Sequence, residues 1–223
     1  MSLIYYYHPT SQPSRAIQAF MHLTDIKYEK HIVDIFNCDH RTPEFAKINP
    51  LNMIPAIDDN GWKMGESEAI IKYLMNSRKV GQEYYPSDPK VRALVDRYLP
   101  YHHSMFRPAI AKYFVVTYKY LKPYSHNTES LDEVRPNVEA TCKKFEEVFI
   151  KDQKYIAGDV FTIADLLAVN ELTQLYYATD FDFNKVPVTK AYIERCLENP
   201  VLLEVQSAIK EFPQKVKEIA AKL

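Results

Sequence analysis

The sequence predicts a chain in two parts, an α/β domain with a mixed four-stranded sheet followed by an all-helical bundle domain. Strand-like and helical segments alternate over residues 1–78. Residues 79–89 are polar, contain prolines and show no hydrophobic period, which is typical of a linker. Residues 90–223 show only helical periodicity. A chain of 223 residues has room for two small domains.

The first part reads as strand, helix, strand, short helix, strand, strand, helix. Residues 3–7 are rich in Ile and Tyr and predict a buried strand, and Pro13 stands where a helix can begin. Further strands are expected over 28–33 and 54–57. The turn Asp58-Asp59-Asn60-Gly61 predicts a hairpin that pairs 62–64 with the preceding strand. Because a hairpin is antiparallel and a strand-helix-strand unit is parallel, the sheet must be mixed.

The second part should consist of helices, including a long one that starts near Val91 and others over 134–149, 189–197 and 201–209. Pro100 and Pro108 lie inside the long helix, and each is expected to kink it or end it. Thr162 and Asp165 have the spacing of a capping box at the start of another helix.

Composition excludes several classes of function. The net charge is −1, so no global field favours nucleic acid or an anionic membrane. With only 4 glycines there is no glycine-rich phosphate loop. The three cysteines are far apart and lack a CxxC pair, which argues against a disulfide framework or a cysteine-based metal site. No stretch is long and apolar enough for a membrane helix, and no signal peptide is recognisable, so we expect a cytoplasmic protein.

Ser11 is the first candidate for chemistry. It lies between the first strand and the helix that Pro13 begins, and a helix N-terminus favours an anion. A serine hydroxyl there can donate a hydrogen bond to a thiolate. The alternative is that Ser11 only caps the helix.

Two further segments suggest a peptide ligand. Proline at the start of an interior strand must be accommodated, and a cis Ile54–Pro55 bond would expose the Ile54 backbone to an extended peptide. Glu66 can accept an ammonium group and Ser67 can donate to a carboxylate, which together suit an α-amino-acid head group. Helix capping is again the alternative for this pair.

Taken together, these segments resemble the glutathione transferase family, and the serine-led version is similar to its theta class. The resemblance covers essentially the whole chain. It is carried by Ser11-Gln12-Pro13-Ser14-Arg15-Ala16, Asn49-Pro50-Leu51, Ile54-Pro55-Ala56, Glu66-Ser67-Glu68-Ala69-Ile70 and Ile163-Ala164-Asp165. It implies a thioredoxin-like glutathione-binding domain over 1–78, a linker over 79–89 and a helical domain over 90–223 that contributes the electrophile pocket. A homodimer is also implied.

The resemblance further implies an enzyme of detoxification that adds the glutathione thiolate to hydrophobic electrophiles, with peroxidase side activity. Glutathione is a co-substrate, and no cofactor or metal is needed. A non-catalytic glutathione-binding or assembly module of the same fold is the alternative function. The implied roles are Ser11 on the sulfur, Ile54 on the cysteinyl backbone beside cis Pro55, Glu66 and Ser67 on the γ-glutamyl end, His40 on the glycyl carboxylate, and Arg107 facing the second substrate.

Two positions depart from the family pattern. Met53 stands where theta-like proteins usually have a lysine that faces the glycyl carboxylate, so His40 with Arg41 or Lys47 must compensate. Ser104 replaces an acidic residue that relatives extend toward the neighbouring subunit's glutathione.

Aromatic residues leave two questions open. Tyr5, Tyr6 and Tyr7 on the first strand are rivals of Ser11 for the sulfur, because other classes of the family use a tyrosine there. Phe106, Tyr113, Phe114 and Tyr176 fit either an apolar electrophile pocket or ordinary core packing.

Overall fold

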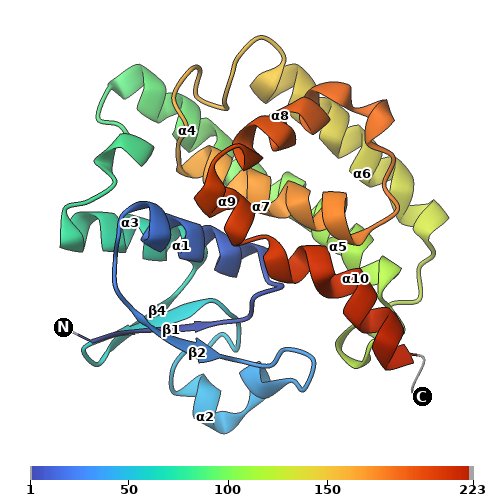
Figure 1. The fold of residues 1–223 in the computed structure, drawn as a ribbon, viewed down its shortest axis with the longest axis horizontal. Helices are drawn as coiled ribbons and strands as arrows, with labels where there is room; N and C mark the ends of the chain where they lie inside the picture. The colour runs from blue at the N-terminus through green and yellow to red at the C-terminus, as the bar shows by residue number, and fades with distance from the viewer. Residues whose placement is uncertain (1, 221–223) are drawn as a thin grey trace.

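The computed structural model describes residues 2–220 and contains a mixed sheet joined to a layer of helices (Figure 1). Strand order is β2-β1-β3-β4, with β1 and β2 parallel and the other neighbours antiparallel. The predicted fold class is therefore confirmed. The last three residues of the predicted helical domain lie outside the described residues. The strands are β1 (Leu3–Tyr7), β2 (Glu29–Ile32), β3 (Ala56–Asp59) and β4 (Trp62–Gly65).

The central strand β1 forms because its side chains alternate between the two faces of the sheet. Leu3, Tyr5 and Tyr7 are buried under helices, and the residues between them are partly exposed. In register, Tyr5 lies between Lys30 of β2 and Ile57 of β3. Strand β3 begins two residues later than predicted, after Pro55, whose ring nitrogen carries no hydrogen for the ladder.

Helices cover both faces of the sheet. In Figure 1, α1 and α3 lie between the sheet and the helical part, and α2 lies on the opposite face. Pro13 occupies the first turn of α1, as predicted. The helices of this part are α1 (Gln12–Leu23), α2 (Pro43–Ala46) and α3 (Ser67–Arg78), with short 3₁₀ turns at Asp39–Arg41 and Gln82–Tyr84.

The helical part packs around α7, whose residues are almost all buried. None of the helices over residues 2–220 is long and apolar enough to cross a bilayer. The helices are α4 (Pro89–Tyr101), α5 (Arg107–Thr117), α6 (Leu131–Phe145), α7 (Ile163–Ala178), α8 (Pro187–Leu197), α9 (Pro200–Glu204) and α10 (Ser207–Ala220), with 3₁₀ turns at Lys122–Tyr124 and Phe183–Lys185 and a π-helical turn at Glu146–Ile150 that continues α6.

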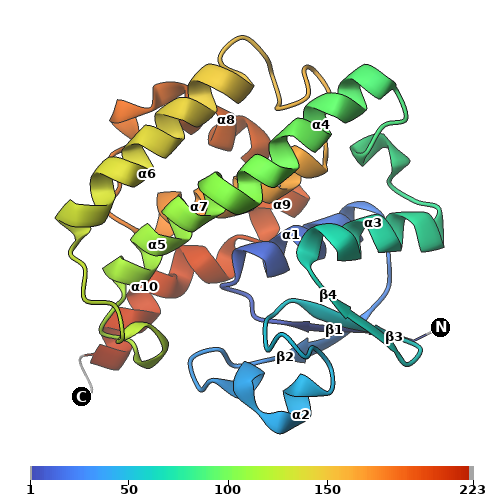
Figure 2. The ribbon, with the colours of Figure 1, turned by 180° about the vertical axis from the view of Figure 1, so that it is seen from behind.

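The long helix predicted from Val91 is divided in an unexpected way. Pro100 lies inside α4 and does not end it. Instead, a π-helical turn η3 (His102–Phe106) joins α4 to α5, and Pro108 occupies the first turn of α5. The two α-helices follow one another as a nearly continuous rod (Figure 2). Single π-turns inside α-helices are frequent at functional sites.

The helix predicted over 201–209 is wrong, because the chain breaks between α9 and α10. Gln206 stands at the break and is buried. Its side-chain amide bonds the Leu202 carbonyl, the Asn170 side chain and Arg15 of α1. The hydrogen bonds of this amide with buried groups of α1 and α7 stabilise the chain more than a continued regular helix would.

The predicted capping box at the start of α7 is present and buried. Asp165 accepts hydrogen bonds from the Thr162 N–H and hydroxyl, the Ile156 N–H and the Tyr192 hydroxyl, at 2.8–3.1 Å. A second box, in which Ser130 caps α6 together with Glu133, is exposed to solvent.

Disrupting these two capping boxes should lower the free energy of unfolding by very different amounts. Asp165→Ala leaves several buried donors without an acceptor and should lower the free energy of unfolding by about 3–5 kcal/mol. Ser130→Ala is the matched control and should cost about 1 kcal/mol, because water replaces the lost acceptor. Urea unfolding followed by far-UV circular dichroism measures both. Equal losses in the two variants would contradict the structural role assigned to Asp165.

Candidate functional site

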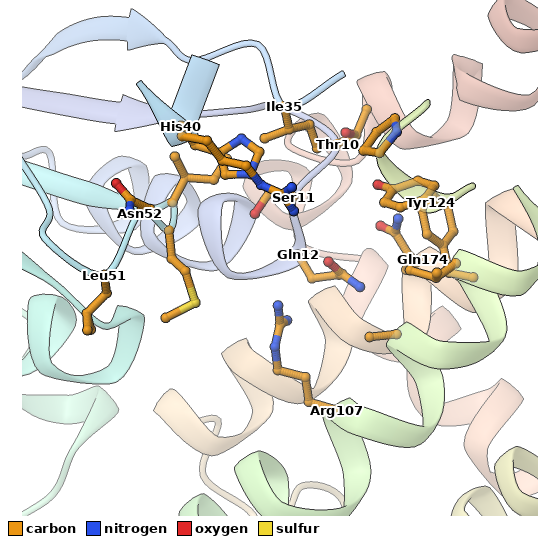
Figure 3. A pocket seen from close by; sticks show the side chains of 17 residues that line it. Thr10, Ser11, Gln12, Ile35, His40, Leu51, Asn52, Arg107, Tyr124 and Gln174 are labelled. Carbon is orange, nitrogen blue, oxygen red and sulfur yellow. The ribbon is translucent and has the colours of Figure 1, made fainter. Parts of the chain in front are cut away.

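Two cavities meet between the α/β part and the helical part. The larger, about 650 Å³, opens between the loop after β1, the loops before α2 and β3, and helices α5 and α7 (Figure 3). The smaller, about 100 Å³, lies between the N-terminus of α3 and η3. Met53, Ile54 and Arg107 line both cavities, so the two are neighbouring parts of one site.

All eight site residues predicted from the sequence line these cavities. Ser11, His40, Met53, Ile54 and Arg107 line the larger one, and Met53, Ile54, Pro55, Glu66, Ser67 and Arg107 line the smaller one. Residues 11, 40, 53–55, 66–67 and 107 are far apart in the chain, and the fold alone brings them together.

Ser11 is the N-cap residue of α1, with φ −78° and ψ 124°. Its N–H donates to the His8 carbonyl and its carbonyl accepts from the Arg15 N–H. Its hydroxyl makes no capping hydrogen bond. Ser11 therefore caps the helix through its backbone carbonyl and not through its side chain, and the hydroxyl is available to a ligand at a helix N-terminus.

None of the three rival tyrosines lines the cavity that contains Ser11. The Tyr5 hydroxyl is buried and donates to the Ser14 carbonyl at 2.7 Å. Tyr7 is buried and stacks on Tyr5, with ring centroids 5.0 Å apart. Tyr6 packs near His31, in a separate hollow on the other face of the sheet.

The loop before β3 is held by Asn49. Its Nδ2 donates to the Met53 carbonyl at 2.7 Å, and its Oδ1 accepts from the Leu51 N–H. The expected cis bond between Ile54 and Pro55 is present. Asn52 adopts a left-handed backbone with φ 55°, and its buried Oδ1 has no hydrogen-bond partner within residues 2–220. The loop therefore presents a buried acceptor at the larger cavity.

The smaller cavity combines a strained residue with a helix N-terminus. Glu66 is exposed, and its φ of 69° lies in a backbone region that residues other than glycine rarely adopt. Ser67 is buried at the first position of α3. Opposite them lie His102, His103 and Arg107. His102 and Arg107 are five residues apart, which is the hydrogen-bond spacing of a π-turn, and they share one side of the rod.

His40 lies at the far end of the larger cavity, beside Arg41. Burial and the neighbouring Arg41 lower the pKa of His40 below its ordinary value of 6.5, so the ring is largely uncharged at neutral pH. Its Nδ1 is buried and has no partner within the described chain. Arg41 therefore supplies the positive charge at this end, while His40 supplies a neutral hydrogen-bonding ring.

Arg107 extends from the start of α5 toward Ser11 and Gln12 (Figure 3). Its guanidinium forms an ion pair with Glu171 of α7. The Glu171 carboxyl is 2 % exposed, whereas the Arg107 side chain is 33 % exposed. One charge of the pair is thus buried and the other reaches the cavity.

The apolar wall of the larger cavity differs from the aromatic set considered in the sequence. Only Phe114 of that set lines the cavity. Phe106 and Tyr113 are fully buried and Tyr176 packs against the core, so these three pack as core residues. The other lining residues had no predicted role in the site, although Gln12 and Leu51 belong to the segments that carry the resemblance: Thr10, Gln12, Ile35, Leu51, Asn52, Ala111, Val115, Pro123, Tyr124 and Gln174.

Family comparisons agree with this geometry. Residues 6–80 match the model of the glutathione S-transferase N-terminal domain, and residues 94–200 match that of the C-terminal domain. Human glutathione S-transferase theta-1 is 32 % identical over 174 residues, which cover 77 % of this chain and 72 % of the relative. The chain belongs to the glutathione S-transferase family. Mouse glutathione S-transferase theta-2 is 30 % identical over 177 residues, covering 78 % and 72 % of the two chains.

Solved structures of theta-class transferases have the same fold. A human theta-class enzyme in complex with the glutathione conjugate of 1-menaphthyl sulfate gives a TM-score of 0.89 at 28 % identity, covering 99 % of this chain and 92 % of that one. Human glutathione transferase theta-2 in complex with glutathione gives 0.88 at 28 % identity, covering 97 % and 91 %.

The close packing of Asn49 against Gly65 predicts that glutathione binding depends on this glycine. A Cβ on Gly65 would stand 2.6 Å from Asn49 Nδ2, so Gly65→Ala should push Asn49 away from the Met53 carbonyl. We expect the affinity for glutathione, measured by titration calorimetry, to fall by roughly fivefold or more. Gly61→Ala in the same hairpin is the control, since no other described residue beyond its two chain neighbours lies within 4 Å of an added Cβ. It should cost stability through its φ of 92° but leave affinity unchanged. Unchanged affinity in Gly65→Ala would contradict the role of Asn49.

Proposed function

We propose that this transferase activates the thiol of glutathione through Ser11 and adds the thiolate to hydrophobic electrophiles. The observation that carries the proposal is the uncommitted Ser11 hydroxyl, which opens into the same cavity as Ile54 and Arg107. Glutathione binding by theta-class relatives of the same fold supports it.

The two cavities fit the two ends of an extended tripeptide. Glu66 is placed to accept the α-ammonium of the γ-glutamyl group, and Ser67, at the N-terminus of α3, to donate to its α-carboxylate. Ile54 offers its backbone to the cysteinyl residue between them. His40 and Arg41 face the glycyl carboxylate, and Met53 contributes no charge there.

Ionisation of the thiol accounts for only part of the rate. A free thiol of pKa ~8.5 is about 3 % ionised at pH 7, and lowering the pKa by two units ionises about three quarters of it. Intrinsic nucleophilicity falls along with the pKa, so the net gain is about threefold. The larger part of the acceleration therefore comes from holding the electrophile against the sulfur and from stabilising the charge that develops.

Arg107 would stabilise the charge that develops in the reaction. Its guanidinium lines both cavities and points toward Ser11, where it can stabilise an anionic leaving group. The apolar wall around Ile35, Phe114 and Tyr124 suits the hydrophobic part of an electrophile. The same thiolate would also serve a peroxidase side activity. A homodimer, a cytoplasmic location and a role in detoxification stay predictions from the resemblance.

Ser11→Ala tests the proposal directly. The variant should lose roughly tenfold or more in kcat toward a chromogenic electrophile, because one donor to the thiolate is removed. Its affinity for glutathione should change less than threefold, since Ile54, Glu66 and Ser67 remain. Ser14→Ala is the matched control: that hydroxyl lies one turn along α1, is buried and has no hydrogen-bond partner within residues 2–220. Full activity in Ser11→Ala would show that another group holds the sulfur. Retention on a glutathione resin without turnover in the wild-type protein would favour the binding-module alternative.

Met53→Lys tests the charge at the glycyl end. The side chain is 51 % exposed and lines the cavity beside His40, so a lysine can reach the carboxylate without repacking the core. We expect glutathione to bind several-fold more tightly, by about 0.5–1 kcal/mol, with the gain reduced at high salt. Met53→Gln has a similar shape without the charge and should leave the affinity unchanged. Identical affinities by titration calorimetry would mean that Arg41 already completes the site.

A further inference from the structure

Glu171 is a buried carboxylate that the proposed reaction does not use. It lies on α7, and one of its oxygens, Oε1, pairs with the Arg107 guanidinium. The other, Oε2, is buried and has no hydrogen-bond partner within residues 2–220. A buried charge without full hydrogen bonding is costly, so the pairing with Arg107 is its main compensation.

The two histidines near Glu171 offset little of the cost of burying its charge. His102 Nε2 of η3 lies 4.0 Å from Oε1, but burial holds the pKa of His102 well below 6.5 and the ring is neutral. Its Nδ1 bonds the Tyr98 hydroxyl of α4 at 3.1 Å. His103 Nε2 lies 3.1 Å from Glu68 Oε2 and forms no hydrogen bond with Glu171 among the described residues.

Arg15 is the second guanidinium near Glu171. It is fully buried on α1, and its hydrogen bonds go to uncharged oxygens. Arg15 and Arg107 each interact electrostatically with the same carboxylate. Two positive groups thus share one negative group, and Arg107 is the one of the two that lines the cavities.

Arg107 stands between this carboxylate and the ligand space. The pair with Glu171 is the one hydrogen bond of its side chain among the described residues. Its remaining N–H groups are free for the cavities it lines. Any anion in the cavity must therefore share the guanidinium with Glu171.

We propose that Glu171 is a built-in counter-ion that competes with anionic ligand groups for Arg107, and so sets the preference of the site for anionic over neutral electrophiles. The inference rests on the proposed function, because it assigns a second substrate to the cavity that contains Arg107. Glu171 acts through Arg107 and touches no substrate, so it is a specificity-determining residue rather than a catalytic one. Its negative charge weakens the attraction of Arg107 for an anion without removing it.

Affinities for two glutathione derivatives test the proposal. Glutathione sulfonate has an anionic group at the sulfur position, and S-methylglutathione has a neutral one there. Glu171→Gln removes the charge and keeps an acceptor for Arg107. It should raise the preference for the sulfonate over the thioether, as a ratio of Kd values from calorimetry, by roughly fivefold. The effect should vanish when Glu171→Gln is introduced into Arg107→Gln, because the residue through which it acts is gone.

A purely structural role gives a different result. It would change both affinities equally, or persist in the Arg107→Gln background, and either outcome would overturn the proposal. If Glu171→Gln does not fold, Glu171→Met replaces it, since an apolar side chain of similar length also removes the charge. The same rise in the ratio is expected.

The design separates this inference from the proposed function. Both readouts are affinities, so a wild-type protein that binds the derivatives without turning over any electrophile would contradict the enzyme function and leave the expected ratio intact. A wild-type protein that binds neither derivative would overturn both. With an active enzyme, the ratio of kcat/KM values for a carboxylated and an uncharged electrophile should shift in the same direction in Glu171→Gln.

Discussion

The arrangement of the site depends on one buried guanidinium. Arg15 of α1 donates to the Thr10 carbonyl, to the Asn170 carbonyl and the Gln174 amide of α7, and to the Gln206 amide at the α9–α10 break, at 2.8–3.0 Å. Burial lowers its pKa to about 9, which still leaves it charged at neutral pH. A desolvated cation tolerates the loss of few of these bonds, so each acceptor is fixed in place.

This clamp determines the geometry of the cavity because its acceptors belong to the cavity wall. Thr10, directly before Ser11, and Gln174, on α7, both line the larger cavity. The Arg15 side chain, which extends from α1 to α7, therefore fixes the distance between the sulfur position and α7. Because α7 also carries Glu171, the partner of Arg107, both Arg15 and Arg107 are held by contacts with α7. An α7 that is buried on nearly all sides is a rigid base for this arrangement.

Local sequence signals predict the elements and residues that depend on local chemistry. The strand over residues 3–7, Pro13 in α1 and the Thr162 capping box each have a physical cause within a few residues, and each is confirmed. The break at Gln206 has no such signal. It depends on contacts with distant segments, because Gln206 bonds Arg15, almost the whole chain away. Glu171 was missed for the same reason, since it forms part of no motif.

The distribution of charge in the site has a consequence for how glutathione is used. Under the proposed placement, Arg107 stands near the sulfur, whereas the glycyl end faces Met53, a neutral His40 and the charged Arg41. Positive charge near the sulfur favours the thiolate and stays useful as negative charge moves to a leaving group. The positive charge of Arg41 at the glycyl end would bind ground state and transition state alike and mainly lower KM. Arg107 is therefore the positive group of the cavity that acts on the reacting atoms, and Glu171 sets how much of its charge an incoming anion can use.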